Sequence, residues 1–287
     1  MEAIVALARP GNHRLYPLEM SDSAERLLDR LARLLATSEH ALVLTGAGTS
    51  TESGLPDYRG AAGLWSDRRF EELAHIEMWR REPEEFWRFY AARLALLDGA
   101  RPNAGHAAIA ELEHLGLVHR VLTQNVDGLH RAAGSRAPLE LHGTLAEVEC
   151  LACGFRGPRQ IAESQLAAGS AVPICPSCGA NLKPAVVLFG ELMPPALADA
   201  QAELARCDLL LCCGSSLQVY PVAAFPRHVH ANGGEIAIVN LGPTDADDIA
   251  GVSIEMKVGD ALPALVERLV ARGHSPAPTA PQPAPRL

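Results

Sequence analysis

The chain has 287 residues, with 25 Lys and Arg against 34 Asp and Glu, which gives a formal net charge of -9. This length suffices for one large α/β domain or two modest ones and excludes a small disulfide-stabilised scaffold. A net negative charge argues against nucleic acid as the principal ligand. No apolar run approaches the roughly 18–20 residues that a membrane span needs, so we expect no membrane association.

The seven cysteines are too sparse for a disulfide framework, and their number is odd. The first residues lack a basic segment followed by an apolar one, as a secretory signal would have. We therefore expect a reducing compartment and a cytoplasmic location.

Strands that alternate with helices predict the fold. Short, mostly uncharged runs predict strands at 41–45, 118–124, 185–189, 209–214 and 235–240. Helical spacing of apolar residues predicts helices at 22–36, 104–115, 196–206 and 259–272. This alternation is typical of an α/β protein with a Rossmann-like, doubly wound parallel sheet.

Two stretches interrupt the alternation. Residues 60–100 contain all three tryptophans and are expected to form a loop followed by helices, while 146–181 holds four cysteines among Gly and Pro. We therefore expect a discontinuous Rossmann-like domain, a helical insertion, a smaller zinc-binding lobe and a disordered Pro-rich tail. In that order, their ranges are 21–59 with 101–145 and 182–273 for the domain, 60–100, 146–181 and 274–287.

Two C-x-x-C pairs give the most specific spacing in the chain, Cys150 with Cys153 and Cys175 with Cys178. Each pair can present two thiolates from one turn, and two such turns complete a tetrahedral shell around Zn(II). Redox chemistry is the alternative. A shell of four thiolates leaves no open coordination position, so the pattern predicts one structural zinc ion.

A glycine turn follows the first predicted strand, at Gly46-Ala47-Gly48-Thr49-Ser50. Glycines let a backbone approach a pyrophosphate, and amide N–H groups at the start of a helix can hold its charge. Thr51 stands where the full G-x-G-x-x-G pattern has its third glycine. A strand-ending turn without a ligand is therefore the alternative.

Polar residues also stand where other predicted strands end. Gln124, Asn125 and Asp127 follow one strand, and Gly214-Ser215-Ser216 and Asn240 end two others. Ligands of open α/β sheets bind at the carboxyl ends of the strands, so these residues outline an elongated site of the kind that a dinucleotide requires. Each of them by itself fits an ordinary turn or a helix N-cap.

Three further features have less specific patterns. The loop Gly54-Leu55-Pro56-Asp57-Tyr58-Arg59 combines a carboxylate, a phenol and a guanidinium, and suits either a phosphate site or a solvated turn. His142 suits proton transfer at neutral pH, although spacing does not distinguish it from a structural histidine or from His130. Tyr90 and Arg93 share one helix face and suit a carboxylate, unless Arg93 lies in solvent on an ordinary amphipathic helix.

In this order the motifs resemble those of the sirtuins, the NAD-dependent protein lysine deacylases. The resemblance runs from about residue 40 to 260 and includes Val187-Leu188-Phe189-Gly190-Glu191 and Gly214-Ser215-Ser216-Leu217. The latter motif looks like class II, whereas Ala74, Tyr90 and Arg93 match the acyl pocket of class III. We expect a bacterial origin.

The resemblance implies that NAD is a co-substrate and that acylated-lysine proteins or peptides bind in a cleft between the two lobes. Deacylation would release nicotinamide and 2′-O-acyl-ADP-ribose, with Asn125 and His142 as the catalytic residues and His142 accepting a ribose-hydroxyl proton. The NAD-binding residues implied are Gly46, Ala47, Gly48, Ser50, Asp57, Tyr58, Arg59, Gln124, Asn125, Asp127, Gly214, Ser215, Ser216, Asn240, Leu241, Gly242 and Val258. The substrate-binding residues implied are Ala74, Tyr90, Arg93, Val187, Phe189, Gly190 and Glu191.

By similarity to sirtuins that accept succinyl- or malonyl-lysine, Tyr90 and Arg93 would meet an acyl carboxylate and Ala74 would leave room for it. Two other functions fit the same motifs: mono-ADP-ribosyl transfer, and non-catalytic binding of ADP-ribose or acyl-lysine. Asn125, Asp127 and His142 together disfavour the non-catalytic function, because simple binding needs no base.

Overall fold

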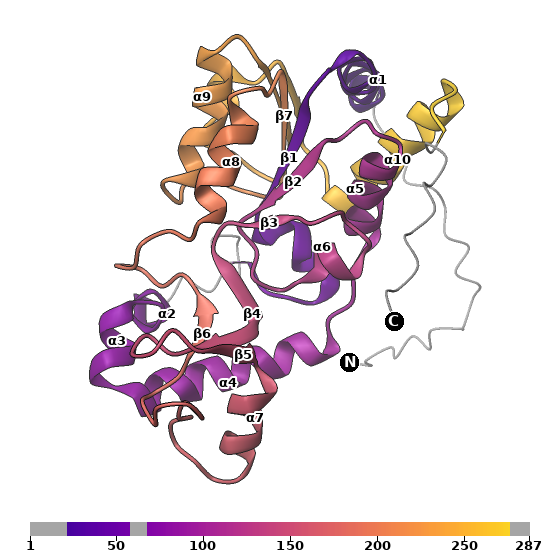
Figure 1. Ribbon diagram of the computed structural model, residues 1–287. Coiled ribbons are helices and arrows are strands. Elements are labelled where there is room, and N and C mark those ends of the chain that lie inside the picture. Colours follow the sequence, from indigo (N-terminus) through magenta and orange to yellow (C-terminus); the bar gives the residue numbers. More distant parts are fainter. Residues whose placement is uncertain (1–21, 58–67, 276–287) are drawn as a thin grey trace, which may run out of the picture.

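The computed structural model describes residues 22–57 and 68–275, which form a larger upper lobe and a smaller lower lobe (Figure 1). The strands of the larger lobe are β1 (Ala41–Thr45), β2 (Arg120–Thr123), β3 (Leu139–Glu140), β7 (Leu209–Cys213), β8 (Glu235–Val239) and β9 (Val252–Ile254). They form one sheet in the order β3-β2-β1-β7-β8-β9, and every neighbouring pair is parallel.

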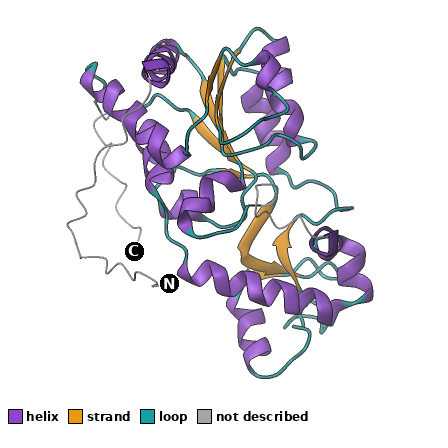
Figure 2. Cartoon of the chain, turned by 180° about the vertical axis from the view of Figure 1, so that it is seen from behind, coloured by secondary structure: helices purple, strands orange, loops and turns teal. Residues whose placement is uncertain are grey.

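Helices cover both faces of this sheet, as Figures 1 and 2 show. One face packs against α1 (Asp22–Thr37), α5 (Ala104–His114) and α10 (Val258–Ala271). The other packs against α8 (Ala196–Leu204) and α9 (Phe225–Ala231). Shorter elements lie in the connections: η1 (Ala47–Ser53), α6 (Leu129–Ala132), η3 (Val222–Ala224) and η4 (Asp247–Ile249).

The strand β1 shows why the sequence forms this sheet. Its five residues are all buried, because helices cover both faces. Ala41 and Val43 belong to the hydrophobic cluster that contains α1, whereas Leu42 and Leu44 belong to the cluster that contains α8. A strand covered on both faces reads as a continuous apolar run, which is the pattern of residues 41–44.

The smaller lobe combines a second sheet with four helices. Its strands are β4 (Gly143–Glu149), β5 (Arg156–Pro158) and β6 (Lys183–Val186), which pair antiparallel in the order β5-β4-β6. Its helices are α2 (Arg68–Leu73), α3 (Ile76–Arg81), α4 (Pro83–Gly99) and α7 (Gln160–Ala167). Phe86 and Trp87 of α4 are fully buried, and the Trp87 indole N–H donates to the carbonyl oxygen of Leu182 at 2.9 Å.

The doubly wound parallel sheet and the smaller cysteine-containing lobe confirm the expected fold class. The prediction of a strand at 185–189 in the parallel sheet is wrong. The structure has β6 at Lys183–Val186, paired antiparallel with β4 in the smaller sheet. The apolar run does not distinguish the two sheets, because it suits a buried strand of either one. The expected domain ranges stay a prediction.

The tail predicted to be disordered at 274–287 lies almost wholly outside the described residues. Within 22–57 and 68–275, no helix is both long enough and apolar enough to cross a membrane.

Candidate functional site

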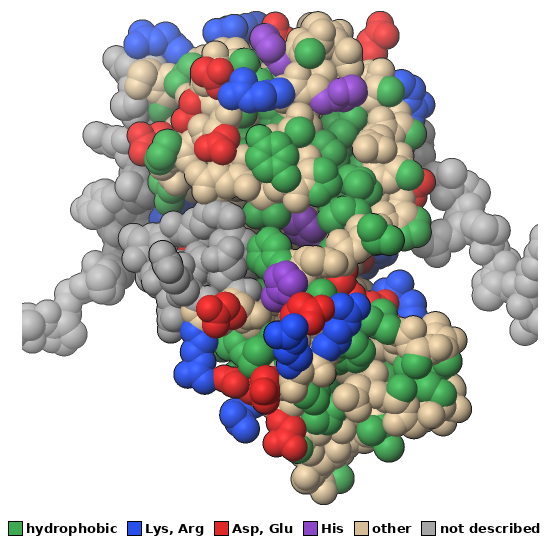
Figure 3. Space-filling model, turned by 90° about the vertical axis from the view of Figure 1, so that its left-hand side faces the viewer, with side chains coloured by type: hydrophobic (Ala, Val, Ile, Leu, Met, Phe, Trp, Pro, Cys, Tyr) green, Lys and Arg blue, Asp and Glu red, His purple; other side chains and the backbone are tan. Residues whose placement is uncertain are grey.

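A cavity of about 680 Å³ lies between the two lobes, at the carboxyl ends of the parallel strands. Figure 3 shows the molecule from the side, with the larger lobe above the smaller one. This size is ordinary for a small-molecule site. Twenty of the residues expected in the site line the cavity: Gly46, Ala47, Gly48, Asp57, Ala74, Tyr90, Arg93, Gln124, Asn125, His142, Val187, Phe189, Gly190, Glu191, Gly214, Ser215, Ser216, Asn240, Leu241 and Val258.

The glycine turn after β1 packs directly on the turn after β7. The backbone N–H of Gly48 donates to the carbonyl oxygen of Gly214 at 2.8 Å, and that of Gly46 donates to Cys213 at 3.1 Å. Gly214 has a φ of +58°, and a Cβ atom there would lie 2.3 Å from the backbone nitrogen of Thr49. The close approach of these two turns therefore requires glycine.

Asn125 connects the turn after β1 to the end of β2. Its side-chain Nδ2 donates to the carbonyl oxygen of Gly46 and to the Ser50 hydroxyl, each at 3.1 Å. The Ser50 hydroxyl donates in turn to Asp127 Oδ2 at 2.7 Å. Ser50 and Asp127 do not line the cavity, but they fix Asn125, which does.

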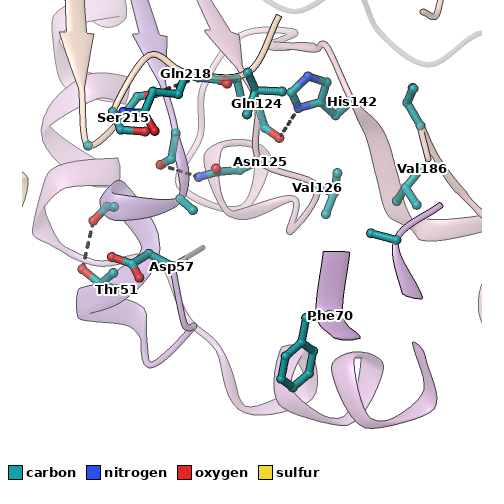
Figure 4. Close-up of a pocket in the computed structure, with 18 of the residues that line it drawn as sticks. Thr51, Asp57, Phe70, Gln124, Asn125, Val126, His142, Val186, Ser215 and Gln218 are labelled. Atoms are coloured by element: carbon teal, nitrogen blue, oxygen red, sulfur yellow. Dashed lines mark hydrogen bonds between the residues drawn. The ribbon is translucent and has the colours of Figure 1, made fainter. Parts of the chain in front are cut away.

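His142 lies at the junction of the lobes, directly before β4. Its Nδ1 is 3.1 Å from the carbonyl oxygen of Gln124, and Figure 4 shows this contact beside Asn125. A carbonyl oxygen can only accept, so Nδ1 carries the proton and Nε2 of the neutral ring is the acceptor. Burial lowers the pKa of His142 below the ordinary value, while the bond to Gln124 opposes this shift. The ring is therefore neutral at pH 7, with a basic nitrogen available at Nε2.

The other candidate histidine, His130, is in a different environment. It is buried, and its Nε2 is 2.9 Å from the Thr45 hydroxyl. Burial, with a smaller effect from His106, lowers the pKa of His130 to about 3. The structure thus separates the two histidines that spacing could not, since only His142 lines the cavity.

Polar side chains continue along the carboxyl edge of the sheet. Gln124 Nε2 donates to the Ser215 hydroxyl at 2.9 Å, which joins the end of β2 to the turn after β7. Asn240, at the end of β8, donates to the carbonyl oxygen of Gly242 at 3.0 Å. Gly242 itself does not line the cavity, whereas Val258, the first residue of α10, does.

The opposite end of the cavity is formed by α4 and the residues before α3. Tyr90 and Arg93 lie on one face of α4 and line the cavity together with Ala74. The Arg93 guanidinium carbon is 5.5 Å from the centre of the Phe89 ring and 5.9 Å from that of Tyr90. This cation lies over aromatic rings at the cavity wall, rather than in open solvent as the alternative required.

Residues 187–191 run along the same wall after β6. The backbone N–H of Phe189 donates to the carbonyl oxygen of Ala74 at 2.9 Å, and Phe189 accepts from Ile76 at 3.0 Å. Val187 donates to the carbonyl oxygen of His142 at 2.8 Å. One segment therefore connects the acyl-pocket candidate Ala74 with His142.

The four cysteines of the smaller lobe converge on one point. The Sγ atoms of Cys150 and Cys178 are 3.5 Å apart, those of Cys153 and Cys175 are 3.7 Å apart, and all four lie within 4.8 Å of one another. Neighbouring sulfurs of a tetrahedral zinc site with ~2.3 Å bonds are about 3.8 Å apart. All four are free thiols, so the cluster is compatible with a structural zinc ion.

Two of the predicted site residues cannot be placed, and several residues that line the cavity were not predicted. Tyr58 and Arg59 fall outside the described residues. Apolar side chains that line the cavity were not predicted, because nothing in their local pattern distinguishes them from core; they include Phe70, Phe89, Val126, Val186 and Met256. Figure 4 shows Phe70, Val126 and Val186 on the side of the cavity away from Ser215.

This arrangement defines a Rossmann-like α/β protein with a ligand site where its parallel strands end. The model of the Sir2 family matches residues 46–221, and this chain belongs to that family. The expected sirtuin resemblance is thereby confirmed, whereas the bacterial origin stays a prediction.

Relatives and solved structures agree with this assignment. A Caldivirga maquilingensis protein named NAD-dependent protein deacetylase is 46% identical over 235 residues, which cover 81% of this chain and 90% of that protein. A Thermococcus kodakarensis protein named NAD-dependent protein deacylase is 42% identical over 248 residues, 85% of this chain and 96% of its own. A solved structure of Sir2 with a p53 peptide and NAD+ has a TM-score of 0.78 at 37% identity and covers 84% of this chain and 98% of its own.

Proposed function

We propose that this protein is an NAD-dependent protein lysine deacylase that produces nicotinamide and 2′-O-acyl-ADP-ribose. One observation carries the proposal: in a Sir2-family chain, the Asn125 network and the basic nitrogen of His142 meet in a single cavity between the lobes. The names of the relatives, and the solved Sir2 complex with peptide and NAD+, support the same activity.

The donor set along the sheet edge fits NAD. Bound NAD would supply the ADP-ribose that receives the acyl group. Asn125 would hold the nicotinamide end, kept in place by Ser50 and Asp127, whose hydroxyl and carboxylate are already hydrogen-bonded. Ser215 and Asn240 would contact the adenosine side, since they follow β7 and β8, which lie on the side of β1 away from β2. Ribose hydroxyls and a carboxamide form neutral or charge-assisted hydrogen bonds with side chains of this kind.

His142 would act as the general base. Its Nδ1 proton is held by the carbonyl oxygen of Gln124, so Nε2 is the only ring atom that can accept a proton. The proton would come from a ribose hydroxyl, whose oxygen then attacks the acyl carbon. Over the whole reaction one water molecule is consumed, and nicotinamide and the lysine amine are the leaving groups. A positioned base of this kind contributes about 10²–10⁴-fold to a rate.

We also propose that the acyl pocket accepts succinyl- or malonyl-lysine. Tyr90 and Arg93 lie side by side on α4 at the cavity wall, and Tyr90 is 4% exposed. A carboxylate that enters such a site needs a charged partner, and a guanidinium with a phenol hydroxyl is a suitable one. Ala74 offers only a methyl group at this wall, which leaves room for the longer chain.

The segment 187–191 would bind the backbone of the acylated peptide by strand addition. Val187, Phe189, Gly190 and Glu191 all line the cavity, which supports this role. We further infer a cytoplasmic location, in keeping with seven cysteines that are all free thiols.

Mass spectrometry of the reaction products tests the activity. The purified protein is incubated with NAD and one peptide sequence that carries acetyl-, propionyl-, malonyl- or succinyl-lysine, and each mixture is compared with one that lacks NAD. We expect free lysine peptide, nicotinamide and O-acyl-ADP-ribose only when NAD is present. A peptide that keeps its acyl group and gains ADP-ribose would instead establish ADP-ribosyl transfer, and no change at all would favour simple binding.

A further inference from the structure

A second group of side chains of the types that bind metals lies at the other end of the main sheet. His40 directly precedes β1, His119 directly precedes β2, and Glu203 lies in the last turn of α8, ahead of β7. The strands β2, β1 and β7 are parallel neighbours, so their amino ends lie together, at the top of the upper lobe in Figure 1. The cavity lies at their carboxyl ends, and the length of the strands separates the two places.

The candidate ligand atoms of this group converge. Glu203 Oε2 lies 2.9 Å from His40 Nε2 and 3.9 Å from His119 Nε2. The two imidazole rings have their centres 4.1 Å apart, and one ligand atom from each of the three residues lies within 4.8 Å of the others. In a tetrahedral zinc site with bonds of about 2.0–2.1 Å, neighbouring ligand atoms are roughly 3.3 Å apart. The two distances to Glu203 Oε2 lie on either side of that value, and the shorter one is a hydrogen bond from His40 Nε2. Zinc would replace the proton of this bond, and small side-chain shifts would then complete the geometry.

We propose that His40, His119 and Glu203 bind one Zn²⁺ ion through two imidazole nitrogens and a carboxylate oxygen. This ligand set suits zinc, which accepts both imidazole and carboxylate ligands. The side chains of His40 and Glu203 are 11% and 13% exposed and are therefore held in place, whereas that of His119 is 51% exposed. The open side at His119 leaves room for a water molecule as the fourth ligand.

Binding there would stabilise the fold rather than take part in deacylation. The three ligands come from three separate segments that enter adjacent strands, so the ion would connect the amino ends of β2, β1 and β7. An ion that binds only the folded chain raises its stability by mass action. The site is thus independent of the proposed function.

Two arginines oppose the ion and set the expected strength of binding. Arg206 Nη2 is 2.8 Å from Glu203 Oε2, and Arg120 Nε is 4.0 Å from Glu203 Oε1. Zinc must displace Arg206 from the carboxylate oxygen. The Arg206 side chain is 61% exposed, so its ion pair contributes little and the guanidinium can move into water. Removal of this cation should therefore strengthen zinc binding.

The proposal is tested by calorimetric titration of Zn²⁺ into protein whose four-cysteine site already holds zinc. Four proteins are compared: wild type, His119→Ala, Arg206→Gln and the control His228→Ala, which removes an exposed histidine of α9 that lies outside the cluster. We expect one additional zinc equivalent in wild type and in the control, with affinity at least tenfold weaker in His119→Ala and severalfold stronger in Arg206→Gln.

Thermal unfolding provides a second measurement on the same proteins. Without added metal, His119→Ala should have the same melting temperature as wild type, because the His119 side chain is half exposed. Added Zn²⁺ should raise the melting temperature of wild type but not of His119→Ala. Absence of an additional equivalent in wild type, or equal zinc binding by wild type and His119→Ala, would overturn the proposal.

Discussion

Lys183 Nζ lies 3.2 Å from Glu191 Oε2, and this contact joins the smaller sheet to the wall of the cavity. The Lys183 side chain is fully buried and also contacts Glu149 Oε1 at 2.7 Å and the carbonyl oxygen of Val186 at 2.8 Å. The same Glu191 Oε2 accepts the backbone N–H of Leu188 at 2.8 Å. One ammonium group therefore fixes both ends of the segment that we propose binds the peptide.

Lys183→Met should impair peptide binding more than NAD binding. Loss of the buried cation leaves Glu191 without its cation and Glu149 with only Arg156 at 4.0 Å, which costs about 3–5 kcal/mol of stability and releases the segment 187–191. We expect the KM for the acyl-peptide to rise at least tenfold while the KM for NAD changes less than threefold, measured well below the melting temperature. Glu191→Gln, which keeps an acceptor for Leu188, should give a smaller rise in the same direction. Equal changes in both KM values would contradict a positioning role.

His142→Ala should lose deacylation and keep NAD binding. The ring is attached through Nδ1 to Gln124, and the substitution removes the only basic nitrogen that we assign to the reaction. We expect kcat to fall at least ~10²-fold, at the low end of what a positioned base contributes. Calorimetry should give an NAD affinity within a few-fold of wild type. An unchanged rate would remove His142 from the mechanism.

The pH profile of kcat/KM should have its acidic limb below the ordinary histidine pKa of about 6.5. The base must be neutral, and burial lowers the pKa of His142, so protonation and loss of activity begin only at lower pH. We expect a flat profile from pH 8 down to about 6.5 and a decline below it. The profile is measured with a protein shown to stay folded over the same range. An acidic limb above pH 7 would contradict this environment for His142.

Cys175→Ala should remove the zinc ion and destabilise the smaller lobe. Cys175 is 2% exposed, and its Sγ is one of four that converge within 4.8 Å. A closed site of four thiolates contributes to folding, so we expect a lower melting temperature together with loss of zinc by elemental analysis. Cys207→Ala is the matched control, because Cys207 is also buried but lies in the larger lobe. The control should keep its zinc. A metal-free Cys175→Ala protein that is as stable and active as wild type would refute the structural role.

The sequence predicts those parts of the fold that local pattern determines. The run 41–45 and the helices near 104–115, 196–206 and 259–272 agree with β1, α5, α8 and α10 to within two residues. Their apolar residues face a core formed by neighbouring elements of regular spacing. The sheet to which β6 belongs could not be predicted, because its pairing with β4 depends on residues about 40 positions earlier in the chain.

The site residues also divide into those that local pattern predicts and those that it does not. Asn125 and the glycine turn stand at strand ends, where open α/β sheets bind ligands, so their place could be predicted. Lys183 could not, because lysine is normally exposed and its burial depends on Glu149, 34 residues away. Histidine spacing left His130 and His142 equivalent, and only their burial and partners distinguish them.

Acyl selectivity gives the sharpest test of the cavity. Arg93 is held over the rings of Phe89 and Tyr90 at the wall beside Ala74. A succinyl carboxylate that reaches this wall would bind the guanidinium, and a hydrogen bond to a charged group contributes about 1.5–3 kcal/mol. Acetyl-lysine lacks the carboxylate and gains nothing from Arg93.

Arg93→Met should therefore lower kcat/KM for succinyl-lysine by roughly tenfold to hundredfold, as that energy implies, and leave acetyl-lysine within about threefold. Methionine keeps an unbranched apolar side chain against Phe89, so the wall should not collapse. The measurement uses acetyl and succinyl versions of one peptide with wild type and variant, and Arg88→Met, an exposed arginine of α4, is the matched control. If Arg93→Met lowers both activities equally, Arg93 supports the fold of the pocket and does not select the acyl group. If wild type does not turn over succinyl-lysine, the acidic-acyl proposal fails while deacylation of acetyl-lysine stands.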